Sequence, residues 1–318
     1  MFTNYFWSSN FLLAGGVGIM NQEFDHIKNV LNCSFKHILI PISSEFYHRN
    51  VFSTAKLLAE KFQSKITLMY IIEEKTLETA DRISDVYRTP YDIEQTKRAI
   101  IRGSTSKAAK LVFSEARQIL SSEDILINER IVRGEFSPVI KNELEKNQYD
   151  LILMGYEKKT MLHYRLFDNV NIPIWIESDT HGDTILAVCS NLAPNQKVPI
   201  MGMYLSQVLK WPLQMLYVVD IQDTVMVDSN GQRSGPKSTT ELTSQGNAFI
   251  EKMKQNGLSV KLTKGGLEKE TLKEASKIGA RLVIIGREHK KKQILNPFSK
   301  GVKRKIAEQT RHSLMFLN

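Results

Sequence analysis

The sequence predicts an α/β protein built from two tandem, doubly wound, parallel five-stranded sheets, each covered by helices on both faces. Two observations lead to this prediction. Apolar segments recur in the same order in both halves of the chain, and segments with helical spacing alternate with them. The length of 318 residues suits two domains of ordinary size.

Four short segments of the first half have counterparts in the second half. The pairs are 37–43 with 184–190, 66–74 with 213–221, 149–157 with 280–288, and 171–177 with 312–318. Each contains a run of consecutive Ile, Leu and Val-rich apolar residues, which is typical of strands buried on both faces of a parallel sheet. Four matches in one order indicate a duplicated domain, with the polar segment 178–183 as the joint.

The repeat predicts a first domain at residues 35–178 and a second at 182–318. Residues 1–34 are expected to be a poorly ordered extension. Their apolar start is shorter than the roughly 18 residues of a membrane helix, and it lacks the positively charged region of a signal peptide. Met20 is an alternative start of the chain.

Helical spacing fills the gaps between the predicted strands. Residues 49–63 place apolar side chains three and four positions apart. Residues 137–148 are expected to begin with Ser137 as N-cap and Pro138 in the first turn. Residues 268–280 are the counterpart and end at the helix terminator Gly279.

Two further segments follow the second predicted strand of each half, at 74–93 and 221–240. They are expected to be tolerated insertions, the second of them a polar loop or partly disordered. After the first insertion, residues 94–120 are long enough for an extended helix, with Gly103 as a break.

Composition excludes several kinds of site. Two cysteines, Cys33 and Cys189, form no disulfide framework and suit a reducing cytoplasm. The seven histidines match no zinc helix motif, and neither a nucleophile elbow nor a phosphate loop of the GxxxxGK[ST] type is present. Ser43 and Ser44 are therefore expected to cap a helix rather than to act as nucleophiles.

The chain resembles tandem universal stress proteins. The resemblance lies in the opening strands of the two halves, at 37–43 and 184–190, and in the glycines that end the fourth strands, Gly155 and Gly286. The resemblance covers the chain from Phe35 to its end. It implies an adenine nucleotide alpha hydrolase-like fold. ATP-binding members carry an acidic residue after the first strand and Gly-x2-Gly-x9-Gly-Ser/Thr after the fourth, whose glycines let the backbone approach phosphates.

The first half departs from this family pattern. Ser43 stands at the acidic position, Gly155 matches the first glycine, Lys158 replaces the second, and Asp168 stands where the third should be. A carboxylate at the place of the phosphates repels them. The first half is therefore expected not to bind ATP in the family manner.

The second half keeps part of the pattern within a cationic stretch. Ser190 replaces the acid, Gly286 matches and His289 replaces the second glycine, while Lys290 begins a run of lysines. The third position falls on Ser299 and Lys300, or on Gly301 if two residues are inserted. Eight lysines and arginines between residues 287 and 305 keep anion binding open, against the alternative of a solvated basic face.

The resemblance implies a non-enzymatic stress-response or regulatory protein of the cytoplasm with degenerate ATP motifs in both halves. Two alternatives stay open: an ATP or AMP sensor that uses the second half, and a nucleotide-dependent enzyme of the wider fold. No cofactor is assigned with certainty.

The final strands of the two halves are expected to pair with each other, and a homodimer and an unknown protein partner stay open. Nucleic acid is a weaker alternative, because Phe298 is the only aromatic residue in the basic stretch. No membrane association is expected.

Overall fold

The computed structural model describes residues 35–43, 46–73, 107–121, 124–155, 170–228, 232–287 and 311–317. They belong to one compact unit, Phe35–Asn318. The extension at 1–34 and the first insertion at 74–93 lie outside the described residues, as does Gly103. No helix of the described residues is long and apolar enough to cross a membrane.

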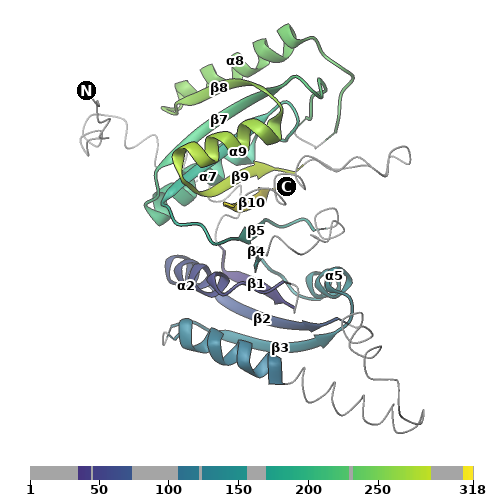
Figure 1. Ribbon diagram of the computed structural model, residues 1–318, viewed down its shortest axis with the longest axis vertical. Coiled ribbons are helices and arrows are strands. Elements are labelled where there is room, and N and C mark those ends of the chain that lie inside the picture. The colour runs from purple at the N-terminus through teal and green to yellow at the C-terminus, as the bar shows by residue number, and fades with distance from the viewer. Residues whose placement is uncertain are drawn as a thin grey trace, which may run out of the picture. The chain divides into compact units, whose positions relative to one another are not determined.

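The fold is α/β with a mostly parallel sheet, as the sequence predicts (Figure 1). The strands of the first half are β1 (His37–Ile42), β2 (Lys65–Ile72), β3 (Ile127–Arg133), β4 (Leu151–Gly155) and β5 (Ile174–Glu177). The strands of the second half are β6 (Thr184–Ser190), β7 (Leu213–Asp220), β8 (Val260–Gly265), β9 (Ala280–Gly286) and β10 (Ser313–Leu317).

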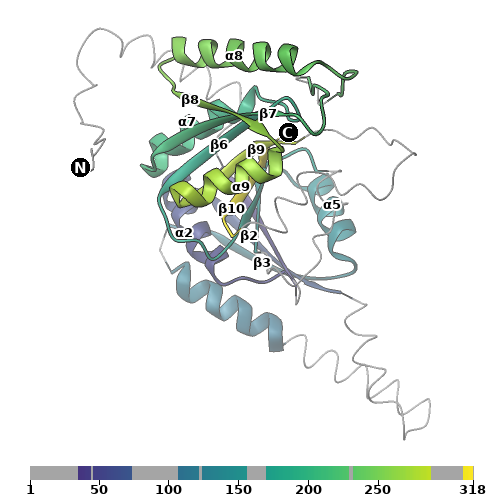
Figure 2. The same ribbon diagram turned by 45° about the horizontal axis from the view of Figure 1, so that its top comes forward.

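The strands form one ten-stranded sheet and not two separate sheets. Its order is β3-β2-β1-β4-β5-β10-β9-β6-β7-β8. The final strands of the two halves, β5 and β10, pair antiparallel at the middle, with Met315 opposite Trp175. This pairing satisfies the backbone groups that two separate sheets would each leave exposed at an edge. The helices near β3 and the α8–β8 pair lie at opposite ends of the sheet (Figure 2).

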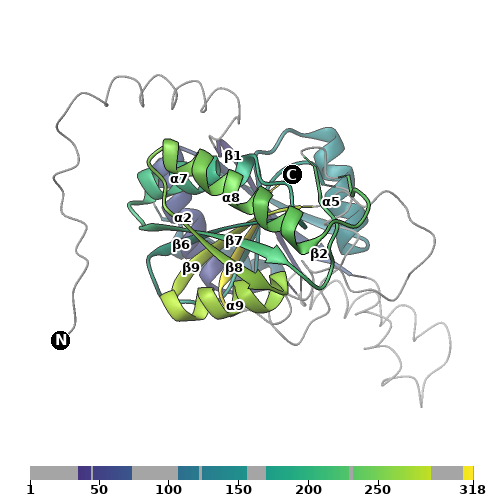
Figure 3. The same ribbon diagram turned by 90° about the horizontal axis from the view of Figure 1, so that it is seen from above.

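The helices cover both faces of the sheet. They are α2 (Asn50–Phe62), α5 (Phe136–Lys146), α7 (Lys197–Leu209), α8 (Thr239–Gln255) and α9 (Leu267–Ile278), together with helical residues 107–119. In the second half α7 and α8 lie on one face and α9 on the other (Figure 3). One cluster of buried apolar side chains runs through both halves, from Leu39 of β1 to Val218 of β7.

Helix ends agree with the sequence at one point and differ at another. Gly279 ends α9 in the left-handed region with φ +60°, which confirms its predicted role as terminator. The prediction that Ser137 caps α5 is wrong. The helix begins at Phe136 after Glu135. Gly134, with φ +139°, turns the chain directly from β3 into the helix, so that Phe136 is buried.

The repeat has a register that the sequence match misses by one residue. Gly155 pairs with Glu177 in the first half, and Gly286 pairs with Leu317 in the second. Glu177 is therefore equivalent to Leu317, whereas the matched letters set it against residue 318. Both segments are short apolar runs, and such runs carry little information on register.

Candidate functional site

The candidate site of each half lies where the order of the strands reverses. These points are the carboxyl ends of β1 and β4 in the first half and of β6 and β9 in the second. Of the residues that the sequence singles out, Ser43, Gly155, Ser190 and Gly286 lie there. The others lie outside the described residues: Lys158, Asp168, His289, Lys290, Ser299, Lys300 and Gly301.

Ser190 begins a tight turn that closes on itself. Its backbone N–H donates to Asn195 Oδ1 at 2.9 Å, and its carbonyl accepts from Asn195 Nδ2 at 2.9 Å. Its hydroxyl oxygen accepts from the N–H of Leu192 at 3.2 Å. Ser190 is fully buried. Its hydrogen-bonding groups therefore hold the turn together and do not face an open cleft.

The turn after β6 passes directly over Gly286 at the end of β9. A Cβ built on Gly286 would lie 2.0 Å from the carbonyl oxygen of Pro194. Only a glycine fits beneath this backbone contact. Residues 191–194 of the turn are all buried, and they follow β6 at the edge of the sheet where open α/β folds commonly hold a ligand.

The first half has the same arrangement. A Cβ on Gly155 would lie 2.6 Å from both Cβ and N of His48, which follows β1. Ser43 exchanges backbone and side-chain hydrogen bonds of 3.3 Å with Phe46, whose ring is fully buried. In both halves the retained glycine therefore accommodates the loop after the first strand.

Two buried polar residues that were not predicted from the sequence fix the loops at the carboxyl ends of the second-half strands. Asn191 accepts from the N–H of Asp220 at 2.7 Å through Oδ1. Its Nδ2 donates to the carbonyls of Asp223 and Val225, and its own carbonyl accepts from Val227 at 2.7 Å. One asparagine thus fastens the segment that follows β7 onto the turn after β6.

Asp220 joins the same segment to α9. Its Oδ1 accepts from the N–H groups of Gln222 and Asp223 at 2.8 and 2.9 Å, and its Oδ2 accepts from Leu267 at 2.6 Å. Leu267 is the first residue of α9, where a carboxylate satisfies free N–H groups and the helix dipole. The position of Asp220, at the carboxyl end of a buried strand, is the sequence signal that could have identified it.

The second insertion is an ordered loop across the described residues 221–228 and 232–238. Val227 and Arg233 form an antiparallel bridge, and Arg233 forms an ion pair with Asp223 at 2.9 Å. Ser238 and Glu241 form a capping box that begins α8. Of the two alternatives expected for this segment, these residues form the polar loop, and Asn191 fastens one arm of it.

Polar residues also connect the two halves. Glu177 of β5 is fully buried and accepts from Arg281 of β9 at 2.6 Å and from Trp175 Nε1 at 2.9 Å. Burial raises the pKa of Glu177 to about 7, although the Arg281 guanidinium opposes the shift. Arg281 also donates to the carbonyl of Thr180.

Arg287 is the one residue of the basic stretch at 287–305 that lies among the described residues. It follows Gly286 directly and is 1% exposed. Its NH2 group donates to the carbonyls of Val170 and Ile172 in the first half, at 2.8 and 2.9 Å. This cation therefore serves the contact between the halves.

Comparison with known protein families finds one match, in the first half of the chain. The model of the universal stress protein family matches residues 34–171. Residues 34–171 are thus similar in sequence to the universal stress protein family. The match ends before the second half begins, and no curated protein matches the chain.

Solved structures extend the likeness in fold to nearly the whole chain. A universal stress protein from Archaeoglobus fulgidus aligns with TM-score 0.58 and 12% identity, over 89% of this chain and 98% of that one. A putative universal stress protein from Pseudomonas aeruginosa aligns with TM-score 0.60 and 13% identity, over 90% and 94%. The second half therefore shares in the fold of universal stress proteins.

Proposed function

We propose that this chain is a non-enzymatic regulatory protein of the universal stress type, whose nucleotide crevices are closed by its own loops. The observation that carries the proposal is the contact of Pro194 with Gly286, repeated by His48 with Gly155. A glycine that would let phosphate approach instead lies beneath main chain. The second-half turn is also hydrogen-bonded on both sides, through Asn195 and Asn191.

The polar groups of the second-half edge support the same proposal. Ser190, Asn191 and Asp220 are each no more than 3% exposed, and all three hold loops or a helix end. A nucleotide would have to displace these bonds, and each buried group left without a partner costs about 1–3 kcal/mol. Degenerate motifs and closed crevices agree with each other. The low cysteine content agrees with a cytoplasmic location, which is part of the proposal.

Calorimetric titration of the full chain with ATP, ADP and AMP tests the proposal. We expect no saturable heat at millimolar nucleotide and no rise in the unfolding temperature, since binding to the folded state alone would raise it. A dissociation constant below about 1 mM, equivalent to about 4 kcal/mol, would contradict the proposal.

The alternatives give different results in the same experiment. Saturable binding without turnover would support a nucleotide sensor. Hydrolysis of ATP that is lost on replacing Ser190 or His289 would support an enzyme. A matched variant, Ser43→Ala, tests whether any such signal comes from the first half instead.

A further inference from the structure

The outer strand of the first half, β3, forms an edge of the sheet that has no strand partner among the described residues. Two of the four large apolar side chains exposed in the described part of the chain, Leu126 and Ile131, lie directly before or within β3, and a third, Leu111, lies in the helix at 107–119. Leu111 and Leu126 are each 72% exposed and Ile131 is 48% exposed. Apolar side chains that are exposed beside an unpaired strand edge favour contact with another protein surface.

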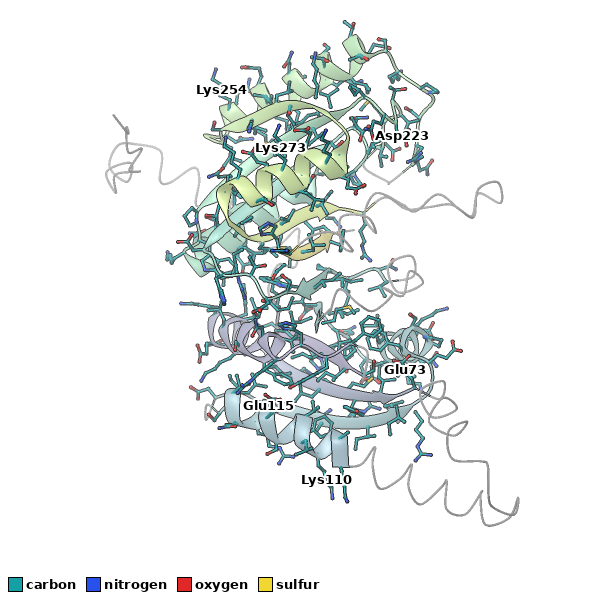
Figure 4. The ribbon with its side chains drawn as sticks, viewed as in Figure 1. Glu73, Lys110, Glu115, Asp223, Lys254 and Lys273 are labelled. Carbon is teal, nitrogen blue, oxygen red and sulfur yellow. The ribbon has the colours of Figure 1, made fainter. Side chains whose placement is uncertain are left out.

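Helical residues 107–119 lie beside this edge, as the labelled Lys110 and Glu115 show (Figure 4). Arg117 of this helix donates two hydrogen bonds to the Glu129 carboxylate, at 2.6 and 2.7 Å. Ile131 is in register with Tyr70, whose ring contacts Phe113 of the same helix. Ile131 therefore lies on the helix side of the sheet.

The hydrogen bonds to β2 show which backbone groups of β3 turn outward. Ile66 N–H donates to the carbonyl of Leu126 at 2.8 Å, and Gly134 N–H donates to the carbonyl of Ile72 at 3.1 Å. Residues 126 and 134 therefore face β2. Because alternate residues of a strand turn their N–H and C=O groups to opposite sides, Glu129, Ile131 and Arg133 present theirs to an incoming strand.

These three residues are complementary to a second copy of themselves. In an antiparallel pair centred on Ile131, Glu129 of one strand faces Arg133 of the other, and the same pair recurs on the opposite side. Cross-strand pairs of opposite charge stabilise a sheet, and like charges destabilise it. A register centred on Glu129 would set two carboxylates against each other, and one centred on Arg133 two guanidinium groups. A register centred on Arg130 would set two guanidinium groups opposite each other, and one centred on Val132 would gain no pair of opposite charge. Charge therefore favours the register centred on Ile131.

We propose that two copies of the chain associate through β3, antiparallel and centred on Ile131, so that the sheet continues from one copy into the other. The contact is two-fold symmetric and uses the same patch on both copies. It satisfies the outward backbone groups of both strands and covers the exposed Ile131 side chains. The proposal does not depend on the function proposed above.

The other edge of the sheet lacks this complementarity. Ile221 N–H donates to the carbonyl of Gly265 at 3.4 Å, so Gly265 faces β7 and Leu262 and Lys264 of β8 turn outward. Of these two outward residues only Lys264 is charged. The β8 strand of a second copy would present no acidic side chain opposite it. Lys264 is exposed and provides a matched position for control.

Sedimentation equilibrium of the full chain tests the proposal. The expected mass is twice 36.4 kDa. Glu129→Arg and Arg133→Glu should each raise the dissociation constant of the dimer at least about tenfold, because each replaces two attractive pairs by repulsive ones. An equimolar mixture of the two variants should restore the dimer, since the altered charges again meet their opposites. Lys264→Glu should leave the dissociation constant unchanged.

Circular dichroism melting of each variant establishes that it is folded. A chain that stays monomeric at all accessible concentrations overturns the proposal. So does a dimer that Ile131→Asp and both charge reversals leave intact. A mixture of the folded charge variants that fails to dimerise, while the unaltered chain dimerises, also overturns the register centred on Ile131.

Discussion

Replacing Gly286 by alanine probes whether the turn after β6 closes the second-half crevice. The added Cβ would lie 2.0 Å from the Pro194 carbonyl oxygen, against an ordinary contact of 3.4–4 Å. The obstacle is main chain, held by Asn195 and Asn191, so that it cannot swing aside as the tip of a side chain would. Relief requires movement of the turn or of β9.

The change in the free energy of unfolding caused by Gly286→Ala follows from two opposing effects. Insertion of atoms into a packed site destabilises by about 1–3 kcal/mol, occasionally more. Alanine also restricts the unfolded chain, which offsets about 0.4–1 kcal/mol. Because the contact is backbone to backbone and unusually short, we expect the upper part of the range to apply, and the folded state to lose roughly 2 kcal/mol.

Urea unfolding followed by circular dichroism measures this loss. Gly235→Ala is the matched control, since a Cβ there meets nothing within 4 Å and its φ is not positive. It should be neutral or slightly stabilising. If Gly286→Ala were as well tolerated as this control, the turn would not lie on β9, and the reasoning for a closed crevice would fail.

Three further predictions concern buried polar groups. Asp220→Ala should destabilise by about 1–2 kcal/mol, because Leu267 and the segment after β7 lose their acceptor; urea unfolding measures it, and an unchanged midpoint would contradict the assigned role. The raised pKa of Glu177, about 7 against 4.5, makes the folded state bind its proton more tightly than the unfolded chain does. The free energy of unfolding should therefore fall as the pH rises from about 4.5 to 7, by at most about 1.4 kcal/mol per pH unit. Glu177→Gln should flatten this slope. Burial also raises the pKa of the Cys189 thiol, so a thiol reagent should modify it only after unfolding; rapid labelling of the folded chain would refute this.

The sequence by itself determined the α/β class and the approximate positions of eight of the strands. Continuous apolar runs report burial on both faces, and burial is a local property of a central strand. The two outer strands, β3 and β8, were not located, because their residues alternate between partly buried and exposed positions. An edge strand has a neighbouring strand on one side only. It therefore buries fewer apolar side chains, and its other side can pair with a further strand.

At the candidate site, the resemblance to universal stress proteins predicted that Ser43 and Ser190 replace an acidic residue and that Gly155 and Gly286 match the first glycine of the family pattern. What these glycines accommodate was decided only by the tertiary structure. The contact between Pro194 and Gly286 and the hydrogen bond from Arg287 to the carbonyl of Val170 each join segments that are far apart in the chain. Neither spacing nor composition encodes such contacts, because they depend on where packing brings one backbone against another.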